Sequence, residues 1–432
     1  MTNNTDVIVI GAGAAGLATA RELSAAGLKV LVLEARDRIG GRIYTDHSLG
    51  FPVELGAEFI HGHSPDIFEL TDTARLEVAQ VSGEMRRKRN GVWGDSGHVM
   101  AEVNHLFENM PSTEPDQSFK EYIDRTRYSA ETKQLAWDFV KGFHAAKPDR
   151  VSVHWLIHTT RAEEAIGGET SYRLRHGYNL LINSIVETID KGRCKVLLET
   201  PVSEIFWEAA KVKVRAAGKE FSAPYLVITL PLAVLKSGKV RFVPELPETK
   251  QRAMALLEMG PVIRVSLCFR SKFWEKAPEM RNLSFLFTDD PHFPTWWTSN
   301  PLPYPILTGW AAAKHAPALD GKRNEELIQT ALDSLGNILE LEKTEILSCL
   351  ERGLVHDWQA DPYSGGAYSY VVTGGMGAPQ ALADSLGGTL FFAGEATNTE
   401  GHNGTVHGAL GSGRRAAIEV LAAAGSRTSS TR

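Results

Sequence analysis

The stretch DVIVIGAGAAGLATARELSAAG, residues 6–27, indicates the fold because a strand pattern, a glycine-rich loop and a helix pattern follow one another directly. DVIVI is an apolar run typical of a buried strand, and LATARELSAAG carries apolar residues at helical intervals up to Gly27. A second strand pattern, KVLVLEA, follows at once. This order predicts a βαβ unit in an α/β fold.

The loop of this unit places Gly11, Gly13 and Gly16 in GxGxxG spacing. The first glycine permits a tight turn, the second lets a pyrophosphate approach the backbone, and the third lets helix and strand pack closely. The helix N-terminus then faces the phosphate charge. Glu34 ends the second strand, where an acid can accept hydrogen bonds from an adenosine ribose. We therefore expect a dinucleotide site, and these residues alone leave NAD and FAD both open.

The next segment, EARDRIGGRIYTDHSLGFPVELGAEFIHG (residues 34–62), adds more glycines around a basic residue. Gly40 and Gly41 precede Arg42, and Gly56 follows a polar hairpin pattern. These glycines would let the backbone approach a ligand, and Arg42 could neutralise a pyrophosphate.

This segment resembles the second FAD motif of the flavin-containing amine oxidase superfamily, which includes monoamine oxidases, polyamine oxidases and flavin-dependent histone lysine demethylases. The resemblance continues in PYLVITLPLAVLK (224–236), FWEKAP (273–278), DWQADPYSGGAYSY (357–370) and FFAGEATNTEGHNGTVHGALGSGRRAA (391–417). It covers roughly residues 5–423 and implies that the dinucleotide is FAD.

The resemblance implies an α/β fold, α+β overall, with two domains. A discontinuous FAD-binding domain would comprise residues 1–80, 192–240 and 383–423, its C-terminal segment adding a last strand and a helix beside the first βαβ unit. Residues 81–191 and 241–382 would form a substrate-binding domain with flanking helices. The strand patterns VIRVSLCF, LSFLF and YPILTGWAA there predict a mixed antiparallel sheet. The polar tail, 424–432, is predicted to be disordered.

The resemblance also implies which residues contact the cofactor. Glu395 is similar to the acid that holds the ribityl or pyrophosphate region, and Val202 to the residue that contacts adenine through its backbone. Monoamine oxidases attach FAD to a cysteine where this chain has Ala367, so we expect non-covalent FAD. The predicted cofactor residues are Gly11, Gly13, Ala15, Gly16, Glu34, Ala35, Arg36, Gly40, Gly41, Arg42, Gly56, Ala57, Glu58, Val202, Gly394, Glu395, Gly404, Thr405 and Val406.

Four residues are predicted to act on the substrate or the reaction. Tyr368 resembles the first of the two tyrosines that flank the amine in monoamine oxidases, whereas Thr405 stands at the position of the second. His61 resembles a histidine near the substrate in polyamine oxidases, although it could be a simple loop histidine. Arg264 replaces a lysine that, in similar enzymes, assists reaction with oxygen. We expect Arg264 either to act as a permanent cation at the flavin or to bind an anionic substrate group, unless it faces solvent.

The implied function is FAD-dependent oxidation of a polyamine or a primary or secondary amine. Hydride transfer to flavin N5 would give an imine that hydrolyses to an aldehyde or ketone, and oxygen would be reduced to hydrogen peroxide. The alternatives are an L-amino-acid oxidase, another FAD-dependent desaturase or oxidase of the superfamily, and a catalytically silent FAD-binding protein.

Composition and net charge indicate which classes of binding partner the chain does not suit. The chain has 432 residues, a net charge of −6 with both signs mixed, and three widely spaced cysteines. It therefore offers no case for nucleic acid, membrane, disulfides or a cysteine-based zinc site. We expect a cytoplasmic enzyme, with a homodimer as one option. No metal is predicted, because His154 and His158 share helical spacing but lack a third ligand. The basic run MRRKRNG (85–91) is interpreted as a solvated hairpin.

Overall fold

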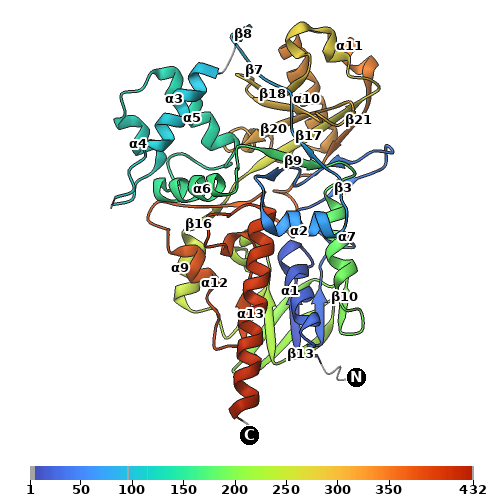
Figure 1. Cartoon of the computed structure of the whole chain (residues 1–432), viewed down its shortest axis with the longest axis vertical. Coiled ribbons are helices and arrows are strands. Elements are labelled where there is room, and N and C mark those ends of the chain that lie inside the picture. Colours follow the sequence, from blue (N-terminus) through green and yellow to red (C-terminus); the bar gives the residue numbers. More distant parts are fainter. Residues whose placement is uncertain (1–4, 95–96, 114, 431–432) are drawn as a thin grey trace.

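The computed structural model describes residues 5–94, 97–113 and 115–430, and its lower half in Figure 1 is built on a five-stranded parallel sheet. In spatial order the strands are β10 (Cys194–Leu197), β2 (Val30–Leu33), β1 (Val7–Ile10), β14 (Tyr225–Ile228) and β23 (Leu390–Phe392). Their apolar residues suit strands that are covered on both faces. The C-terminal strand was expected beside the first βαβ unit, but β14 separates β23 from β1.

Alternate residues of these strands enter two different cores, because successive side chains point to opposite faces of a sheet. Val7 and Val9 pack with helices α1 (Ala14–Ala25), α7 (Asn179–Thr188) and α13 (Val406–Ser430). Ile8 and Ile10 belong to the core that faces a second sheet. That sheet contains β13 (Lys219–Ala223), β12 (Lys211–Ala216), β11 (Val202–Glu208) and β15 (Arg241–Val243).

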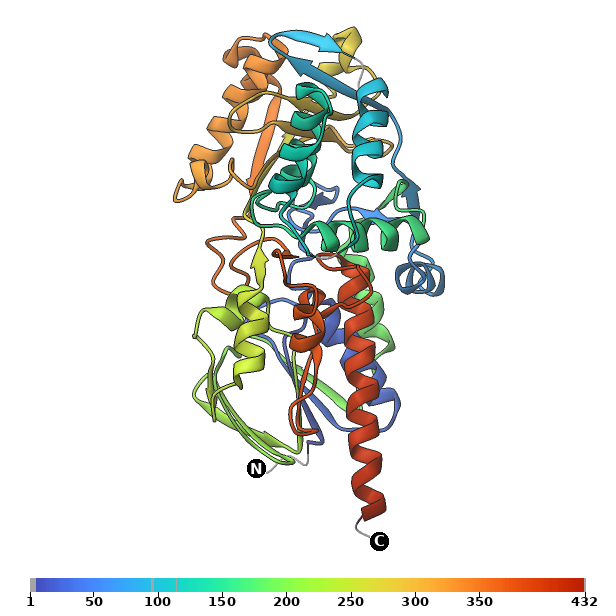
Figure 2. The same cartoon turned by 90° about the vertical axis from the view of Figure 1, so that its left-hand side faces the viewer.

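Helix α13 packs closely on α1, so the two ends of the chain meet through helices. The Thr19 hydroxyl donates to the Gly413 carbonyl at 3.0 Å. A Cβ at Gly413 would lie 2.3 Å from the Ala15 carbonyl oxygen, which explains a glycine here. Figure 2 shows α13 running beyond the sheet. The tail from residue 424, which was expected to be disordered, is helical to Ser430 because the alanine-rich run before it favours helix. Residues 431–432 lie outside the described residues.

The upper half contains the mixed sheet that the strand patterns predicted. The order is β21 (Leu350–Val355), β17 (Val262–Phe269), β20 (Ile306–Ala312), β19 (Thr295–Thr298), β18 (Leu283–Thr288), β7 (Glu84–Arg89) and β8 (Val92–Gly94). All neighbours are antiparallel except β18 and β7. Helices α10 (Asn324–Leu339) and α11 (Lys343–Cys349) pack in the core on one side. Helices α3 (Gly97–Glu108), α4 (Phe119–Arg125), α5 (Ala130–Gly142) and α6 (Val153–Ala165) form a separate group in Figure 1.

Shorter elements complete the chain. They are β3 (Thr45–Asp46), β4 (Val53–Glu54), β5 (Ile60–His61), α2 (Pro65–Thr73), β6 (Val78–Gln80), β9 (Ser171–Leu174), α8 (Leu232–Lys236), α9 (Glu248–Ala255), β16 (Leu257–Met259), β22 (Ser369–Val371) and α12 (Ala378–Ala383). Residues of α7, α9 and α12 pack in the two cores of the lower half, although these helices fall in the predicted substrate-binding segments. A helical pattern shows that one face is apolar, but not which sheet it covers.

The basic run at 85–91 forms the expected hairpin of β7 and β8, with positive φ at Asn90 (48°) and Gly91 (76°). Its charges are not simply solvated, which corrects the interpretation from sequence. Lys88 is buried and pairs with Glu340, while Arg87 and Arg89 pair with acids on α5. The difference arises because β7 lies inside the sheet, between β8 and β18.

Candidate active site

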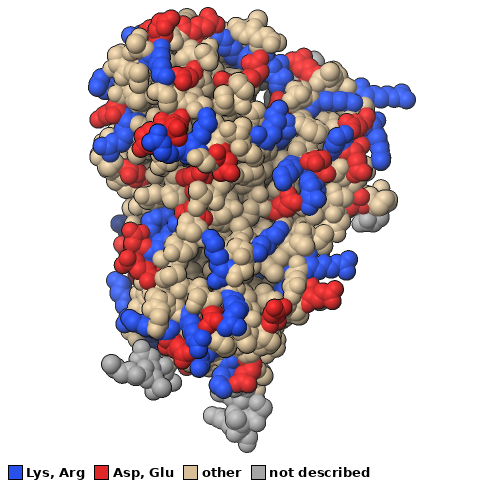
Figure 3. Space-filling model, turned by 180° about the vertical axis from the view of Figure 1, so that it is seen from behind, with Lys and Arg blue, Asp and Glu red and all other residues tan. Residues whose placement is uncertain are grey.

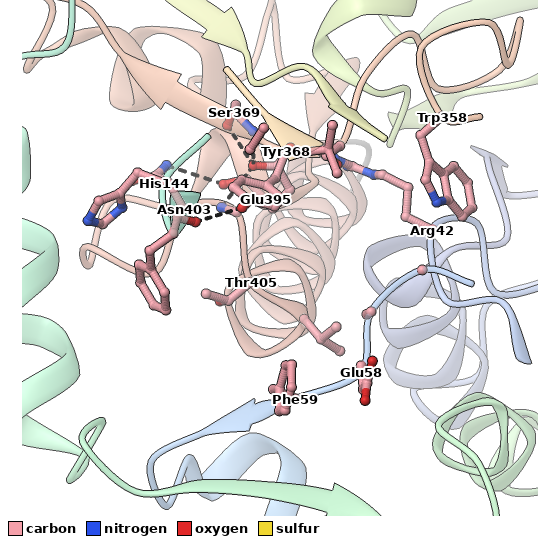
Figure 4. Close-up of a pocket in the computed structure, with 18 of the residues that line it drawn as sticks. Arg42, Glu58, Phe59, His144, Trp358, Tyr368, Ser369, Glu395, Asn403 and Thr405 are labelled. Atoms are coloured by element: carbon pink, nitrogen blue, oxygen red, sulfur yellow. Dashed lines mark hydrogen bonds and ion pairs between the residues drawn. The ribbon is translucent and has the colours of Figure 1, made fainter. Parts of the chain in front are cut away.

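A single large cavity of about 1330 Å³ is lined by residues of both halves. It exceeds the roughly 300–1,000 Å³ of ordinary small-molecule pockets, so it has room for a dinucleotide together with a substrate. Every residue predicted to bind the cofactor or to act in the reaction lines this cavity except Gly16. Figure 4 shows the part where residues near the start of the chain face those of the 357–370 and 391–417 motifs.

Gly16 and its neighbours shape the strand-to-helix turn. A Cβ at Gly16 would lie 1.9 Å from the Gly11 carbonyl oxygen, so only glycine allows this approach of helix and strand. Gly11 has φ of +102°, a conformation that favours glycine. Gly13 precedes α1, whose first backbone N–H groups lack intrahelical partners and can face a phosphate.

The Glu34 carboxylate lies at the end of β2, where the sequence placed it. It is buried and accepts hydrogen bonds from the backbone N–H of Ala12 at 2.7 Å and of Arg36 at 2.9 Å. Farther along the cavity, Gly394 has φ of +123° and no neighbouring atom within 4 Å of a Cβ built there. The turn, the helix N-terminus and this open space fit a bound FAD.

Two arginines that were expected to face the cofactor are already matched by carboxylates. Arg36 makes a bidentate pair with Asp361, at 2.6 and 2.7 Å. Arg42 donates to Glu395 at 2.9 Å and to the carbonyl of Ala367 at 2.8 Å. Both arginines still line the cavity, but their charges are largely neutralised within the protein. The role of Arg42 as a counter-charge for a pyrophosphate stays a prediction.

Glu395 organises the loop before α13, as Figure 4 shows. Its carboxylate accepts hydrogen bonds from the Ser369 hydroxyl at 2.6 Å and the Gly404 N–H at 2.9 Å. The Asn403 side chain donates to the Glu395 backbone carbonyl at 3.2 Å. These contacts fix the loop against Arg42 and leave the carboxylate little capacity for a ligand.

Glu58 and Arg264 belong to a buried cluster beside the cavity. The Glu58 carboxylate accepts hydrogen bonds from Arg264, Arg173 and the indole of Trp297, the last at 3.1 Å. Arg264 also donates to the Gly56 carbonyl at 2.8 Å and is 4% exposed. Burial raises the pKa of Glu58, but the two guanidinium groups outweigh this effect and lower it.

This cluster changes the expectations for both predicted residues. Arg264 does not face solvent, and its guanidinium is not free to bind a substrate carboxylate. The carboxylate of Glu58 is used by protein donors, and the contact of Glu58 with the cofactor stays a prediction. Protein donors surround it because a buried carboxylate is stable only with nearby opposite charge and hydrogen bonds.

The part of the cavity around Tyr368, called the reaction chamber below, is lined by the aromatic side chains of Phe143, Trp310 and Tyr368. The Tyr368 hydroxyl donates to the Phe143 carbonyl at 2.6 Å, which fixes the ring in the cavity wall. The hydroxyl of Thr405 donates to the His402 carbonyl and accepts from the Gly408 N–H at 3.0 Å. Thr405 therefore caps the start of α13 and supplies no second aromatic wall.

Burial lowers the pKa of histidines that line the cavity, among them His61, His144 and His407. His61 lies within hydrogen-bond distance of the Ser171 hydroxyl at 3.2 Å, and burial lowers its pKa to about 4. His407 is 4% exposed, and burial together with His402 and His61 lowers its pKa to about 3. Its Nε2 has no partner among the described residues.

Several cavity residues escaped the sequence reasoning. His407 lies in the quoted TVHGA segment, and Trp358 in the DWQADPY segment, where it donates to the Leu55 carbonyl at 2.7 Å. These two could have been selected from their motifs. Phe143 and Trp310 carry no such signal, because a helix pattern or a strand pattern does not show which aromatic faces a ligand.

Other kinds of site find no support in the part of the chain that the structure describes. No group of histidines, cysteines and acids there could hold a metal, and His158 lies instead against the Thr399 carbonyl at 3.2 Å. Basic and acidic residues are interspersed on the face in Figure 3. No described helix has the length and apolar character needed to cross a bilayer. The cytoplasmic location and the homodimer stay predictions.

Three features together are typical of flavin-dependent oxidoreductases. They are the dinucleotide cradle, formed by the glycine-rich turn and the N-terminus of α1, the large cavity, and the aromatic reaction chamber. The chain belongs to the family of flavin-containing amine oxidoreductases, whose family model matches residues 14–135 and 117–421. The recognition from sequence is thereby confirmed, as are an FAD cofactor and oxidoreductase chemistry on amines.

Curated relatives agree with this assignment. The chain is 29% identical to polyamine oxidase 3 of Oryza sativa subsp. japonica over 454 residues, which cover 97% of this chain and 89% of that protein. It is also 29% identical to human lysine-specific histone demethylase 2, covering 97% of this chain but 54% of the longer demethylase.

Solved structures share the fold. Putrescine oxidase bound to putrescine has a TM-score of 0.82 at 23% identity, covering 98% of this chain and 100% of that one. Cyclohexylamine oxidase from Brevibacterium oxydans IH-35A has a TM-score of 0.81 at 21% identity, covering 97% and 99%.

Proposed function

We propose that this protein is an amine oxidase that uses non-covalent FAD and oxygen to oxidise a primary or secondary amine or a polyamine. The observation that carries the proposal is the continuous cavity that joins the dinucleotide cradle to the aromatic chamber around Tyr368. Relatives named as polyamine oxidase and putrescine oxidase support the same class of substrate.

The glycine-rich turn at Gly11 and Gly13 and the space at Gly394 would hold FAD, which would supply two-electron oxidation: the amine would become an imine that hydrolyses, and oxygen would become hydrogen peroxide. The chain supplies position and polarity. His61 and His407 line the cavity as neutral groups, so they add no positive charge beside the amine. The amine must be neutral when it is oxidised, because only the neutral amine has the lone pair that stabilises the developing iminium.

The cluster around Glu58 gives the cavity a fixed positive bias. Two guanidinium groups, of Arg173 and Arg264, share the Glu58 carboxylate, and the nearby Glu54, whose pKa burial raises to about 7, offsets the remaining positive charge only in part. A fixed positive charge favours negative charge that develops in the cavity. We propose that this whole cluster acts as the permanent cation expected at Arg264.

The L-amino-acid oxidase alternative stays open at this site. It requires an arginine for the substrate carboxylate. Arg264 is occupied by Glu58 and the Gly56 carbonyl, but Arg161 also lines the cavity. The catalytically silent alternative is decided by experiment.

The test is anaerobic addition of monoamines, diamines, polyamines and α-amino acids to the yellow protein. We expect amines to bleach the flavin absorbance, and air to restore it with release of hydrogen peroxide. Bleaching by α-amino acids alone would favour the amino-acid oxidase. No bleaching by any compound would contradict enzymatic turnover.

A further inference from the structure

Two lysines line one side of the cavity without a matching acid. Lys141 is in the last turn of α5 and is 7% exposed, and Lys314 lies just after β20 and is exposed. Both line the cavity, and they are close enough to affect each other's charge. Among the described residues, neither forms an ion pair with a carboxylate, although Asp138 lies near enough to interact with Lys141 electrostatically.

The acids in the same part of the cavity are already used by other groups. Asp138 accepts hydrogen bonds from Arg89 at 2.8 Å and from Gln134 at 2.8 Å. Asp289 accepts from the backbone N–H of Asn90, and Asp290 from those of His292 and Phe293. These carboxylates accept hydrogen bonds that fix the β7–β8 hairpin and a turn, so they are not available as counter-charges for Lys141 and Lys314.

The buried ammonium of Lys141 lowers the stability of the fold when it has no counter-charge. Burial and the neighbouring Lys314 lower its pKa to about 8, so at neutral pH most of the population still carries the charge. Its ammonium lies 5.1 Å from the ring centroid of Trp137, a weaker compensation than an ion pair. A buried charge that lacks an ionic partner destabilises the protein, and an anion placed between the two lysines would relieve that cost.

The lysine pair and Tyr368 line the same cavity. Lys141 precedes Gly142 and Phe143 in the chain, and the carbonyls of these two residues accept from the indole of Trp310 at 3.0 Å and from Tyr368. A molecule long enough to extend along the cavity from Tyr368 can therefore reach the lysines.

We propose that Lys141 and Lys314 bind an anionic group, a carboxylate in the simplest case, at the far end of the amine substrate. The preferred substrate is then an ω-amino acid rather than a diamine of the same length. This inference rests on the proposed amine oxidation and names the substrate class within it. The rival group is Glu163, a carboxylate of the same cavity with no polar partner among the described residues, which would instead attract a second ammonium.

The experiment compares an alkylamine, the ω-amino acid and the diamine of equal chain length, using FAD-loaded protein and kcat/KM for each. We expect the wild type to favour the ω-amino acid by about tenfold or more, which corresponds to about 1.4 kcal/mol. The double variant K141M/K314M should lose that preference through KM. The charge reversal K141E/K314E should shift it toward the diamine. Lys120→Met, an exposed lysine on α4, removes the same charge outside the cavity and serves as the control.

Binding measured without turnover gives a second readout. An alkyl carboxylate of the same length should bind the wild-type holoenzyme in calorimetry and bind K141M/K314M at least tenfold more weakly. An unchanged carboxylate affinity in that variant, or a wild-type preference for the diamine, overturns the inference and points to Glu163. These results leave amine oxidation intact. Failure of all amines to bleach the flavin would instead contradict the proposed function itself.

Discussion

The buried cluster around Glu58 allows a sharp test, because the chain contains an exposed counterpart. Glu58 lies between Arg173 and Arg264, with side-chain exposures of 8%, 6% and 4%. Glu204 likewise lies between two arginines, but these are 49% and 59% exposed. We predict that Glu58→Gln destabilises the protein strongly, whereas Glu204→Gln has a much smaller effect.

The magnitude follows from burial. At an effective dielectric constant of 20, two unit charges 4 Å apart interact by about 4 kcal/mol. Breaking a buried ion pair costs about 3–5 kcal/mol, because the remaining charge stays unpaired. Since Glu58 matches two guanidinium groups, we expect the free energy of unfolding to fall by the upper part of that range. At the surface, water screens the arginines that remain after the control substitution.

Urea unfolding, followed by tryptophan fluorescence, measures both variants. The pKa of Glu58 is lowered in the folded state, so its contribution is present above the ordinary glutamate pKa of about 4.3 and is lost as the pH falls through the folded value. The difference between wild type and Glu58→Gln should therefore shrink in acid. Equal shifts for Glu58→Gln and Glu204→Gln would refute the reasoning. If Glu58→Gln does not fold, Glu58→Asp, which keeps the charge, should recover folding.

Four further predictions concern the site and the scaffold. Tyr368→Phe removes a neutral hydrogen bond worth about 1 kcal/mol and should reduce kcat/KM less than tenfold. Tyr368→Ala also removes the ring and should weaken amine binding more. Unchanged kinetics in both variants would show that Tyr368 does not contact the substrate. His61 and His407, with pKa values of about 4 and 3, stay neutral between pH 5 and 8, whereas Glu163 and Lys141, with pKa values of about 7 and 8, titrate near the upper part of that range. The part of the flavin-reduction profile that follows the neutral amine should shift between two substrates of different amine pKa, and coincident profiles would show that a protein group governs the rate. Lys250→Met should lower the free energy of unfolding by about 2–4 kcal/mol, because the buried ammonium donates to three backbone carbonyls at the end of α12, and an unchanged urea midpoint would contradict that role. Acid precipitation should leave the yellow colour in the supernatant, since Ala367 offers no sulfur for attachment, and colour in the pellet would show a covalent flavin.

Features that depend on local order along the chain could be predicted from the amino-acid sequence. Glycine spacing and apolar runs fix the turn between β1 and α1, because Gly11 needs a positive φ and Gly16 must approach the backbone. The mixed sheet was predictable for the same reason, since strand periodicity is a local property. The motif order along the chain was enough to recognise the family, and nearly all predicted residues reached one cavity.

The pairing of charged side chains, in contrast, depends on the three-dimensional packing of the chain. Arg42 pairs with Glu395, and Arg264 with Glu58, although the members of each pair lie far apart in the sequence. A charged residue in a motif looks available for a ligand, but electrostatic energy depends on distance and burial, and neither can be read from sequence position. The same holds for Lys141, whose helix pattern gives no hint that its ammonium lies buried beside a second lysine at the cavity.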